Sequence, residues 1–127
     1  MHRLKTRPQF QATMAAGTLA RTAHFALHGL PLDTPHPLFA HGEVWLGALV
    51  PKRWARRAVT RNAIRRQIYA LAGEHAPLLP RAAYVVRLRT AFDRQQFVSA
   101  ASQALKHAVR AELELLFSRL PRPAVQP

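Results

Sequence analysis

Alternating apolar and polar residues predict three strands along the chain. Residues 23–29 alternate, residues 44–50 form a near-continuous apolar run that ends at Pro51, and residues 82–89 alternate again. The middle run is typical of a strand that is buried on both faces. The alternation predicts one face with Phe25 and Leu27 and another with His24, Ala26 and His28; in the last strand it separates Tyr84, Val86 and Leu88 from Val85, Arg87 and Arg89.

Apolar residues that recur every three or four positions predict three helices. The first covers residues 8–16, with Pro8 in its first turn and Gly17 as its stop. The second covers residues 58–72, and the third covers residues 94–117. The apolar side of the second helix is predicted to hold Val59, Ala63, Ile64, Ile68, Ala70 and Leu71, and its polar side Arg61, Asn62, Arg65, Arg66 and Tyr69.

The order helix, strand, strand, helix, strand, helix predicts a single small α+β domain. A strand before and after the second helix makes a βαβ crossover, so we expect one helix packed on a small mixed sheet and a long C-terminal helix. The 127 residues, 49% of them hydrophobic, suffice for one core. The predicted limits are a basic N-terminal tail at residues 1–7, a folded domain at residues 8–117 and a Pro-rich flexible tail at residues 118–127.

Positive charge is concentrated at the start of the second helix. Nineteen Lys and Arg against six Asp and Glu give a net charge of +13, and no acidic residue lies between Glu43 and Glu74. Such a block would repel itself without a partner, so a polyanion such as a nucleic acid is the expected ligand. The cations of this block are Lys52, Arg53, Arg56, Arg57, Arg61, Arg65 and Arg66.

Other chemistry has little support in the sequence. The six carboxylates are few and scattered, which disfavours a two-metal nuclease, and His24 and His28 would lie roughly 13 Å apart on a strand, too far to share a metal ion. No glycine loop for a small phosphorylated substrate is present. The chain has no cysteine and no long apolar stretch, so we expect a cytoplasmic protein with no membrane partner and no small-molecule substrate.

The segment Arg61-Asn62-Ala63-Ile64-Arg65-Arg66, preceded by a strand and a basic turn, resembles the signature of the bacterial ribonuclease P protein subunit. In that family the core of the motif is Arg-Asn-Arg-hydrophobic-Lys/Arg-Arg. The resemblance extends from Phe10-Gln11 to the Arg-ended strand and the final helix. Two residues depart from the family pattern, namely Ala63 in place of the usual Arg and Met14 in place of a second aromatic residue.

The resemblance implies a protein that assists a catalytic RNA. In that family the RNA, with its bound Mg²⁺, removes the 5′ leader of precursor tRNA by endonucleolytic cleavage, and the protein holds no metal tightly and has no catalytic residue. The implied partners are the catalytic RNA and precursor tRNA. The implied contacts to the catalytic RNA are Arg61, Asn62, Arg65 and Arg66, with Lys52, Arg53, Arg56 and Arg57 extending the same surface. Leader contacts are expected at Phe10, Met14, Phe25, His28, Arg87 and Arg89. The alternative is a non-catalytic structural RNA- or DNA-binding protein of ribosomal or nucleoid type.

Overall fold

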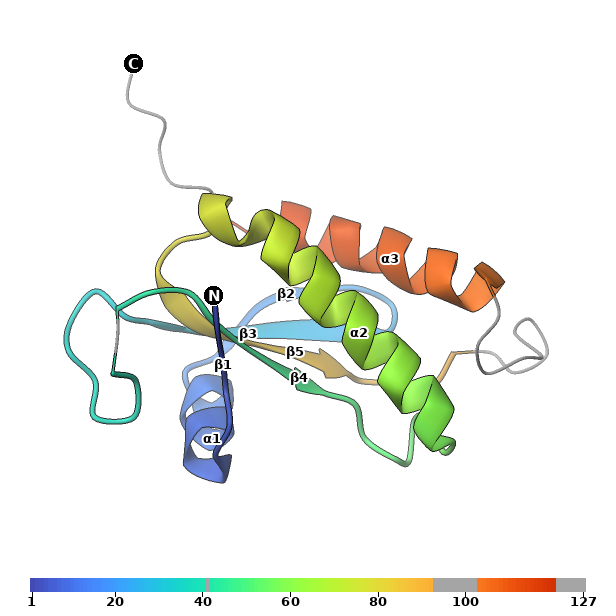
Figure 1. Ribbon diagram of the computed structural model, residues 1–127, viewed down its shortest axis with the longest axis horizontal. Coiled ribbons are helices and arrows are strands. Elements are labelled where there is room, and N and C mark those ends of the chain that lie inside the picture. Colours follow the sequence, from blue (N-terminus) through green and yellow to red (C-terminus); the bar gives the residue numbers. More distant parts are fainter. Residues whose placement is uncertain (41, 93–102, 121–127) are drawn as a thin grey trace, which may run out of the picture.

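The structure, a computed structural model, describes residues 1–40, 42–92 and 103–120, which form a five-stranded sheet with helices on both faces (Figure 1). The α+β class predicted from the sequence is confirmed. In chain order the elements are β1 (His2–Arg3), α1 (Arg7–Ala15), β2 (Thr18–Arg21), β3 (Phe25–Pro31), β4 (Trp45–Leu49), α2 (Ala58–His75), the short 3-10 helix η1 (Ala76–Leu78), β5 (Ala82–Leu88) and α3 (Gln103–Ser118).

The sheet is mixed, with strand order β1-β4-β5-β3-β2. Strands β1, β4 and β5 are parallel neighbours, whereas β3 is antiparallel to both β5 and β2. Strand β4 leads through α2 into its parallel neighbour β5, which confirms the predicted βαβ crossover. The two edge strands were not predicted from the sequence, because β1 has only two residues and the register of β2 shifts between Thr18 and Ala20.

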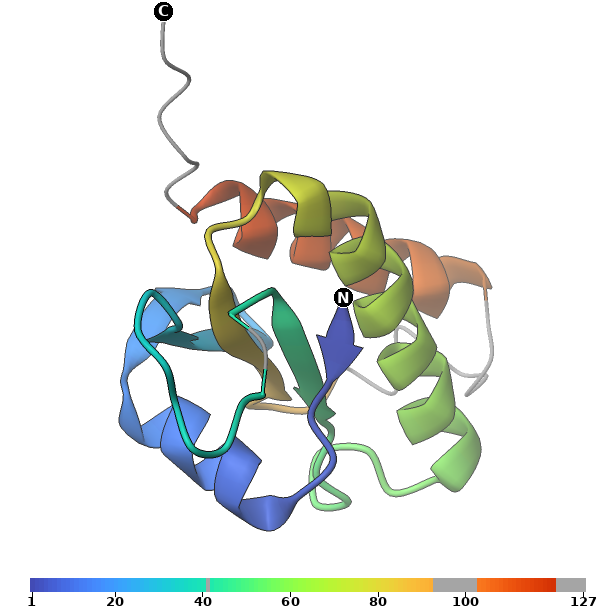
Figure 2. The ribbon, with the colours of Figure 1, turned by 60° about the vertical axis from the view of Figure 1, so that its left-hand side comes forward.

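The two faces of the sheet have separate helical covers (Figure 2). Helices α2 and α3 pack on one face and bury the larger core, which includes Phe25, Leu27 and Tyr84. Helix α1 lies on the other face, over a smaller cluster that includes Leu4, Phe39 and Val85. Strands β3, β4 and β5 supply side chains to both clusters because successive residues point to opposite faces.

Local signals define α1 as predicted. The Thr6 hydroxyl accepts a hydrogen bond from the Gln9 backbone N–H, and the Gln9 side chain accepts one from the Thr6 backbone N–H, which completes a capping box. The helix ends before Gly17, whose φ of 126° is strained for residues with a Cβ atom.

Helix α2 begins at Ala58 as predicted, but it differs from its prediction at its C-terminal end and on its surface. It continues past Gly73 to His75, whose ring stacks on Phe117 of α3 at a centroid distance of 5.4 Å, so tertiary packing outweighs the glycine signal. Val59 is 46% exposed and Ala70 is also exposed. Both lie about 100° or more around the helix from each residue of the buried stripe of Ile64, Ile68 and Leu71, at 100° per residue.

The folded unit also extends beyond the predicted domain limits. Residues 1–7 contain β1 and the buried Leu4, whose backbone N–H donates to Leu46 O at 2.9 Å, so this segment is part of the sheet and its flank. Leu120 is buried in the larger core, so the predicted C-terminal tail starts too early. Residues 121–127, and the predicted start of the last helix at residues 94–102, lie outside the described residues. Within the described residues, no helix has the length and apolar character needed to cross a membrane.

Candidate nucleic-acid interface

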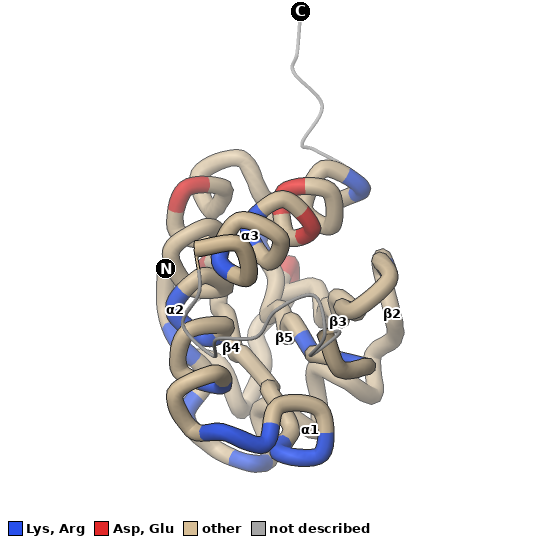
Figure 3. Tube along the Cα trace, turned by 90° about the vertical axis from the view of Figure 1, so that its right-hand side faces the viewer, with Lys and Arg blue, Asp and Glu red and all other residues tan. Residues whose placement is uncertain are grey.

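The predicted cations gather on the turn after β4 and on the first half of α2 (Figure 3). With Asn62 they make eight predicted contacts, of which six are exposed and two, Arg61 and Arg65, are half-buried. We call this set the basic surface: Lys52, Arg53, Arg56, Arg57, Arg61, Asn62, Arg65 and Arg66. Ala63, which stands where the resembling family has Arg, is 8% exposed and packs toward the core side, as the helical projection predicted.

No carboxylate neutralises the basic surface within residues 1–40, 42–92 and 103–120. The ion pairs of Glu74, Glu112 and Glu114 join α3 to the C-terminal part of α2 and to the β2–β3 turn. Figure 3 shows these acidic positions at the opposite end of α2 from the basic surface. Cations that share a face and lack counter-charges create a positive potential that attracts polyanions.

The N-terminus of α2 adds to this positive potential. Its N-cap residue, Arg57, makes no side-chain capping hydrogen bond, and the first turn contains no acidic residue. The free backbone N–H groups of a first turn carry the positive end of the helix dipole. The field of the helix and the charges of the side chains therefore have the same sign here.

Arg61 also has a structural role that the sequence did not reveal. Its Nη1 donates hydrogen bonds to Ala55 O at 3.0 Å and Arg56 O at 2.8 Å, so it ties the basic turn to the helix. Farther along, Arg65 Nη1 donates to Asn62 Oδ1 at 3.2 Å, and Arg66 Nε donates to Asn62 O at 3.3 Å. These contacts within the basic surface orient the side chains without neutralising their charge.

Arg3 and Tyr69 lie next to the basic surface, although the sequence analysis did not select them as contacts. Arg3 Cζ lies 4.0 Å from the centroid of the Tyr69 ring. Beside this pair, between β1 and α2, is a hollow of about 520 Å³ lined by Arg3, Asn62, Arg65, Arg66, Tyr69 and Ala70. The helical projection had placed Tyr69 on the outward face of α2, but no sequence signal connected it to Arg3.

The sheet face under α1 holds four of the six predicted leader contacts, of which Phe10, Met14 and Arg87 are half-buried and His28 is buried. Phe10 and Met14 are half-buried against the smaller core cluster. A Cβ atom on Gly47 would lie 2.6 Å from Phe10 Cε1, so the Phe10 ring rests directly on β4. Arg87 is half-buried on this same face of β5, where its register partners are Ala26 and Leu49.

His28 supports Arg87 and exposes almost no surface of its own. It is 6% exposed; Arg87 Nε donates to its Nε2 at 3.3 Å, and its Nδ1 lies 3.3 Å from Thr18 Oγ1. With Nε2 as an acceptor, the proton sits on Nδ1. Burial, followed by the charges of Arg87 and Arg21, lowers the pKa of His28 from its ordinary 6.5.

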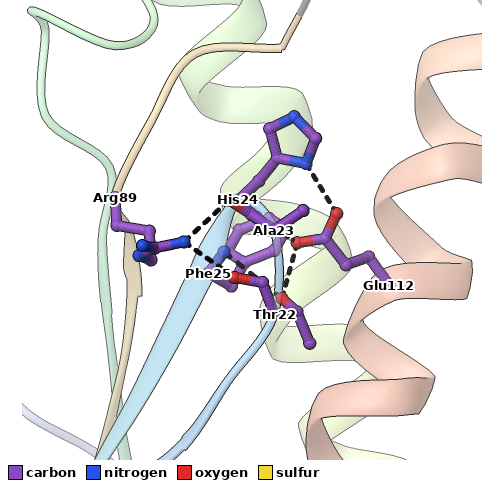
Figure 4. A network of polar contacts seen from close by, with 6 residues as sticks. All are labelled: Thr22, Ala23, His24, Phe25, Arg89 and Glu112. Atoms are coloured by element: carbon purple, nitrogen blue, oxygen red, sulfur yellow. Dashed lines mark hydrogen bonds and ion pairs between the residues drawn. The ribbon is translucent and has the colours of Figure 1, made fainter.

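The other two predicted leader contacts, Phe25 and Arg89, have structural roles. Phe25 is fully buried in the larger core, on the face covered by α2 and α3, so the prediction that it contacts a leader is wrong. Arg89 Nη1 donates to Thr22 O and Ala23 O, both at 2.9 Å (Figure 4). The Glu112 carboxylate holds the same β2–β3 turn through Thr22 Oγ1 and His24 N. Arg89 therefore braces this turn.

Metal-ligating residues do not cluster in the described part of the chain. No three His, Asp or Glu side chains there are close enough to share an ion. His24 Nδ1 pairs with Glu112 at 2.7 Å, whereas His28 bonds to Thr18 and Arg87. The two histidines thus belong to different hydrogen-bond networks.

Comparisons of the sequence and of the structure with known proteins all identify the same family. The family model "Ribonuclease P" matches residues 1–113. The ribonuclease P protein component of Bordetella parapertussis is 34% identical over 120 residues, covering 94% of this chain and 92% of the relative, and that of Paraburkholderia xenovorans is 32% identical over 125 residues, covering 94% and 81%. The ribonuclease P protein of Staphylococcus aureus has a similar fold, with a TM-score of 0.70, 19% identity and coverage of 93% of this chain and 94% of that one.

Proposed function

Because this chain belongs to the ribonuclease P protein family, we propose that its basic surface binds the catalytic RNA of that enzyme while the sheet face under α1 binds the 5′ leader of precursor tRNA. Ribonuclease P is a ribonucleoprotein endoribonuclease, and the RNA carries its chemistry. The chain is its protein subunit, so its residues act by binding and positioning. We infer that it works in the cytoplasm, where precursor tRNA is made.

The observation that carries this proposal is the uncompensated charge of the basic surface. Seven cations and the N-terminus of α2 share one region, and no carboxylate within the described ranges pairs with them. Cations that contact phosphates release the counterions condensed on a nucleic acid, and this release drives binding. Arginine is suited to the task because its planar guanidinium can contact two phosphate oxygens at once.

The sheet face under α1 offers contacts of the kind that single-stranded RNA uses. Phe10 and Met14 supply half-buried apolar surface, and Arg87 supplies a cation on the adjoining strand. Unpaired bases stack on aromatic and apolar side chains while cations contact the backbone. In this proposal His28 orients Arg87 through its Nε2, and Arg89 maintains the turn at the end of β3.

The catalytic Mg²⁺ is assigned to the RNA in this proposal. The described carboxylates of Glu74, Glu112 and Glu114 form ion pairs with Arg or His, and they do not converge with other possible ligands. Mg²⁺ prefers oxygen ligands, which RNA phosphates supply in number. The protein would lower the Mg²⁺ requirement by adding fixed positive charge at the RNA surface.

Reconstitution tests this function directly. The purified protein, the catalytic RNA and a precursor tRNA are mixed at low Mg²⁺, where we expect the protein to restore leader cleavage. A second substrate with a leader of one nucleotide should benefit less, because it cannot extend across the face under α1. Cleavage that the protein does not stimulate would contradict the proposal and favour a structural nucleic-acid-binding role, and cleavage by the protein without RNA would overturn it.

A further inference from the structure

The hollow between β1 and α2 is built around a cation–π pair, Arg3 and Tyr69. The Arg3 guanidinium carbon lies 4.0 Å above the centre of the Tyr69 ring. One face of a guanidinium in this position is covered by the ring, and the other is directed away from it. Arg3 is exposed, so this outer face is open to a ligand.

Hydrogen bonds to the sheet hold the backbone around Arg3 and the side chain of Tyr69. The residues on either side of Arg3 bond to β4, with His2 N donating to Val44 O at 3.0 Å and Leu4 N donating to Leu46 O at 2.9 Å. The Tyr69 hydroxyl accepts a hydrogen bond from Ala48 N at 3.3 Å. The pair is therefore preorganised, which reduces the entropy that a ligand would lose on ordering it.

The rest of the hollow is suited to a phosphate and a base edge. Arg65 and Arg66 line it, and neither pairs with a carboxylate in the described part of the chain. Asn62 also lines it; its Oδ1 accepts from Arg65, which leaves its amide N–H groups as donors for a base. Cations, an amide and a planar stacking surface occur together within about 520 Å³, a volume in the usual range for a small-ligand site.

We propose that this hollow binds one unpaired nucleotide of the catalytic RNA, with its base stacked on the outer face of Arg3 and its phosphate held by Arg65 and Arg66. This inference rests on the proposed function, in which the basic surface binds the catalytic RNA. The hollow shares Asn62, Arg65 and Arg66 with that surface. RNA is the favoured occupant because unpaired RNA bases stack on guanidinium planes. A duplex keeps its bases stacked on one another, so it would make no use of the Arg3–Tyr69 pair.

The substitution Arg3→Lys separates stacking from charge. Lysine keeps the positive charge but has no planar group to place between a base and Tyr69. We expect the affinity for catalytic RNA in a filter-binding assay to fall roughly five- to thirty-fold, the usual effect of losing one stacked base. The salt dependence of binding should be unchanged, because the number of cations is the same. The matched control is Arg81→Lys, at an exposed arginine before β5 that does not line the hollow.

The outcomes distinguish this inference from the proposed function. Unchanged affinity of Arg3→Lys, with clear weakening of the double variant Arg65→Ala and Arg66→Ala, would overturn the nucleotide site and leave the basic surface intact as an RNA-binding region. Equal losses in Arg3→Lys and Arg81→Lys would also overturn the site. Unchanged affinity of both Arg3→Lys and the double variant would count against the proposed function as well.

A photo-crosslinking experiment identifies the occupant. The chain has no cysteine, so Ala70→Cys creates a unique attachment point for a crosslinker at the rim of the hollow. With catalytic RNA, we expect crosslinks to map to an unpaired nucleotide. Ala111→Cys on α3, also exposed, is the matched control. Crosslinks confined to base-paired nucleotides, or no more frequent than those of the control, would overturn the proposal.

Discussion

Arg61 and Arg66 belong to the same motif but have different surroundings. Arg61 is half-buried and donates from Nη1 to two carbonyl oxygens of the preceding turn. Arg66 is exposed, and its one hydrogen bond stays within the helix. A charge-assisted bond to an otherwise unpaired carbonyl stabilises a fold, whereas an exposed bond within a helix contributes little.

This difference predicts distinct effects of two alanine substitutions. Arg61→Ala should lower the free energy of unfolding by about 1–2 kcal/mol and also weaken RNA binding, because the basic turn loses its tie to α2. Arg66→Ala should weaken RNA binding with almost no change in stability. Urea denaturation and filter binding of both variants check the pair. Equal losses of stability would show that the Arg61 bonds do not hold the turn.

The environment of His28 predicts a pH dependence of stability. Its pKa is lowered in the folded protein by burial and by Arg87 and Arg21, so the unfolded chain binds the proton more readily. The resulting stability is fully present above the unfolded pKa of about 6.5 and is lost as the pH falls through the lower folded pKa.

Replacing His28 with glutamine removes this titration. The stability of the native protein relative to His28→Gln should decline as the pH is lowered from about 7 toward 5, and it should be constant above pH 7. Thermal or urea denaturation across this range measures the difference. A difference that is independent of pH, or that grows as the pH falls, would contradict the effect of Arg87 and burial on His28.

The candidate site shows what residue patterns can and cannot predict. Alternation placed Phe25 correctly opposite His28, but it does not say which face of a strand a helix will cover. Phe25 proved to face the larger core, and Phe10 the smaller one. Arg3 and Tyr69 are 66 positions apart in sequence and meet only because β1 joins the sheet beside α2. No local pattern encodes a contact of that kind.

At the scale of elements, the position of α1 depends on Gly47 of β4. The Phe10 ring occupies the space of a missing side chain, with Cε1 2.6 Å and Cζ 2.8 Å from where a Cβ atom would lie. The helix therefore approaches the sheet more closely than it could over any other residue. This close approach sets the distance between α1 and the strands at the proposed leader-binding face.

A double-mutant cycle tests this contact. Gly47→Ala should lower the free energy of unfolding by about 1–3 kcal/mol, because the new methyl group overlaps the Phe10 ring and forces it to move. In a Phe10→Ala background the same substitution should cost much less, since the methyl group then has room. Urea denaturation of the four proteins gives the coupling. The same cost in both backgrounds would show that Phe10 does not rest on Gly47.

Elements with a long periodic pattern were predicted, whereas short ones were not. The alternation of residues 82–89 and the apolar run of residues 44–50 correspond to β5 and β4, and the helical stripe of residues 58–72 corresponds to α2. The two residues of β1 are too few for any period, and they pair with β4 only after the rest of the sheet defines an edge. Sheet edges are a tertiary property, which explains why both edge strands were missed.

Across the whole molecule, charge is separated along α2. The basic surface lies at its N-terminal half, while Glu74 and its ion pair with Arg110 lie near its C-terminal end, next to α3 with Glu112 and Glu114 (Figure 3). An RNA backbone is attracted to the first region more than to the second, where carboxylates accompany the cations. The separation therefore orients the protein before close contacts form.

The number of neutralised phosphates can be measured from salt dependence. If about five phosphates are contacted, the logarithm of the RNA-binding constant should fall against the logarithm of salt concentration with a slope of about −3.5 to −4.5. The double variant Arg65→Ala and Arg66→Ala should reduce the magnitude of this slope by about 1.4–1.8. The matched control, Arg81→Ala with Lys106→Ala, removes the same charge outside the basic surface. A flat dependence in the native protein would contradict electrostatic anchoring.

The hydroxyl of Tyr69 has a consequence for self-association. Strand β4 pairs with β1 only as far as Leu46. Farther along β4, the Ala48 N–H donates a hydrogen bond to the Tyr69 hydroxyl instead. An unoccupied strand edge can recruit the edge of another copy and start a growing aggregate. The tyrosine that supports the proposed nucleotide site thus also disfavours intermolecular strand pairing at this edge. A residue that replaced Tyr69 would have to contact Arg3 and also accept the hydrogen bond from Ala48 N.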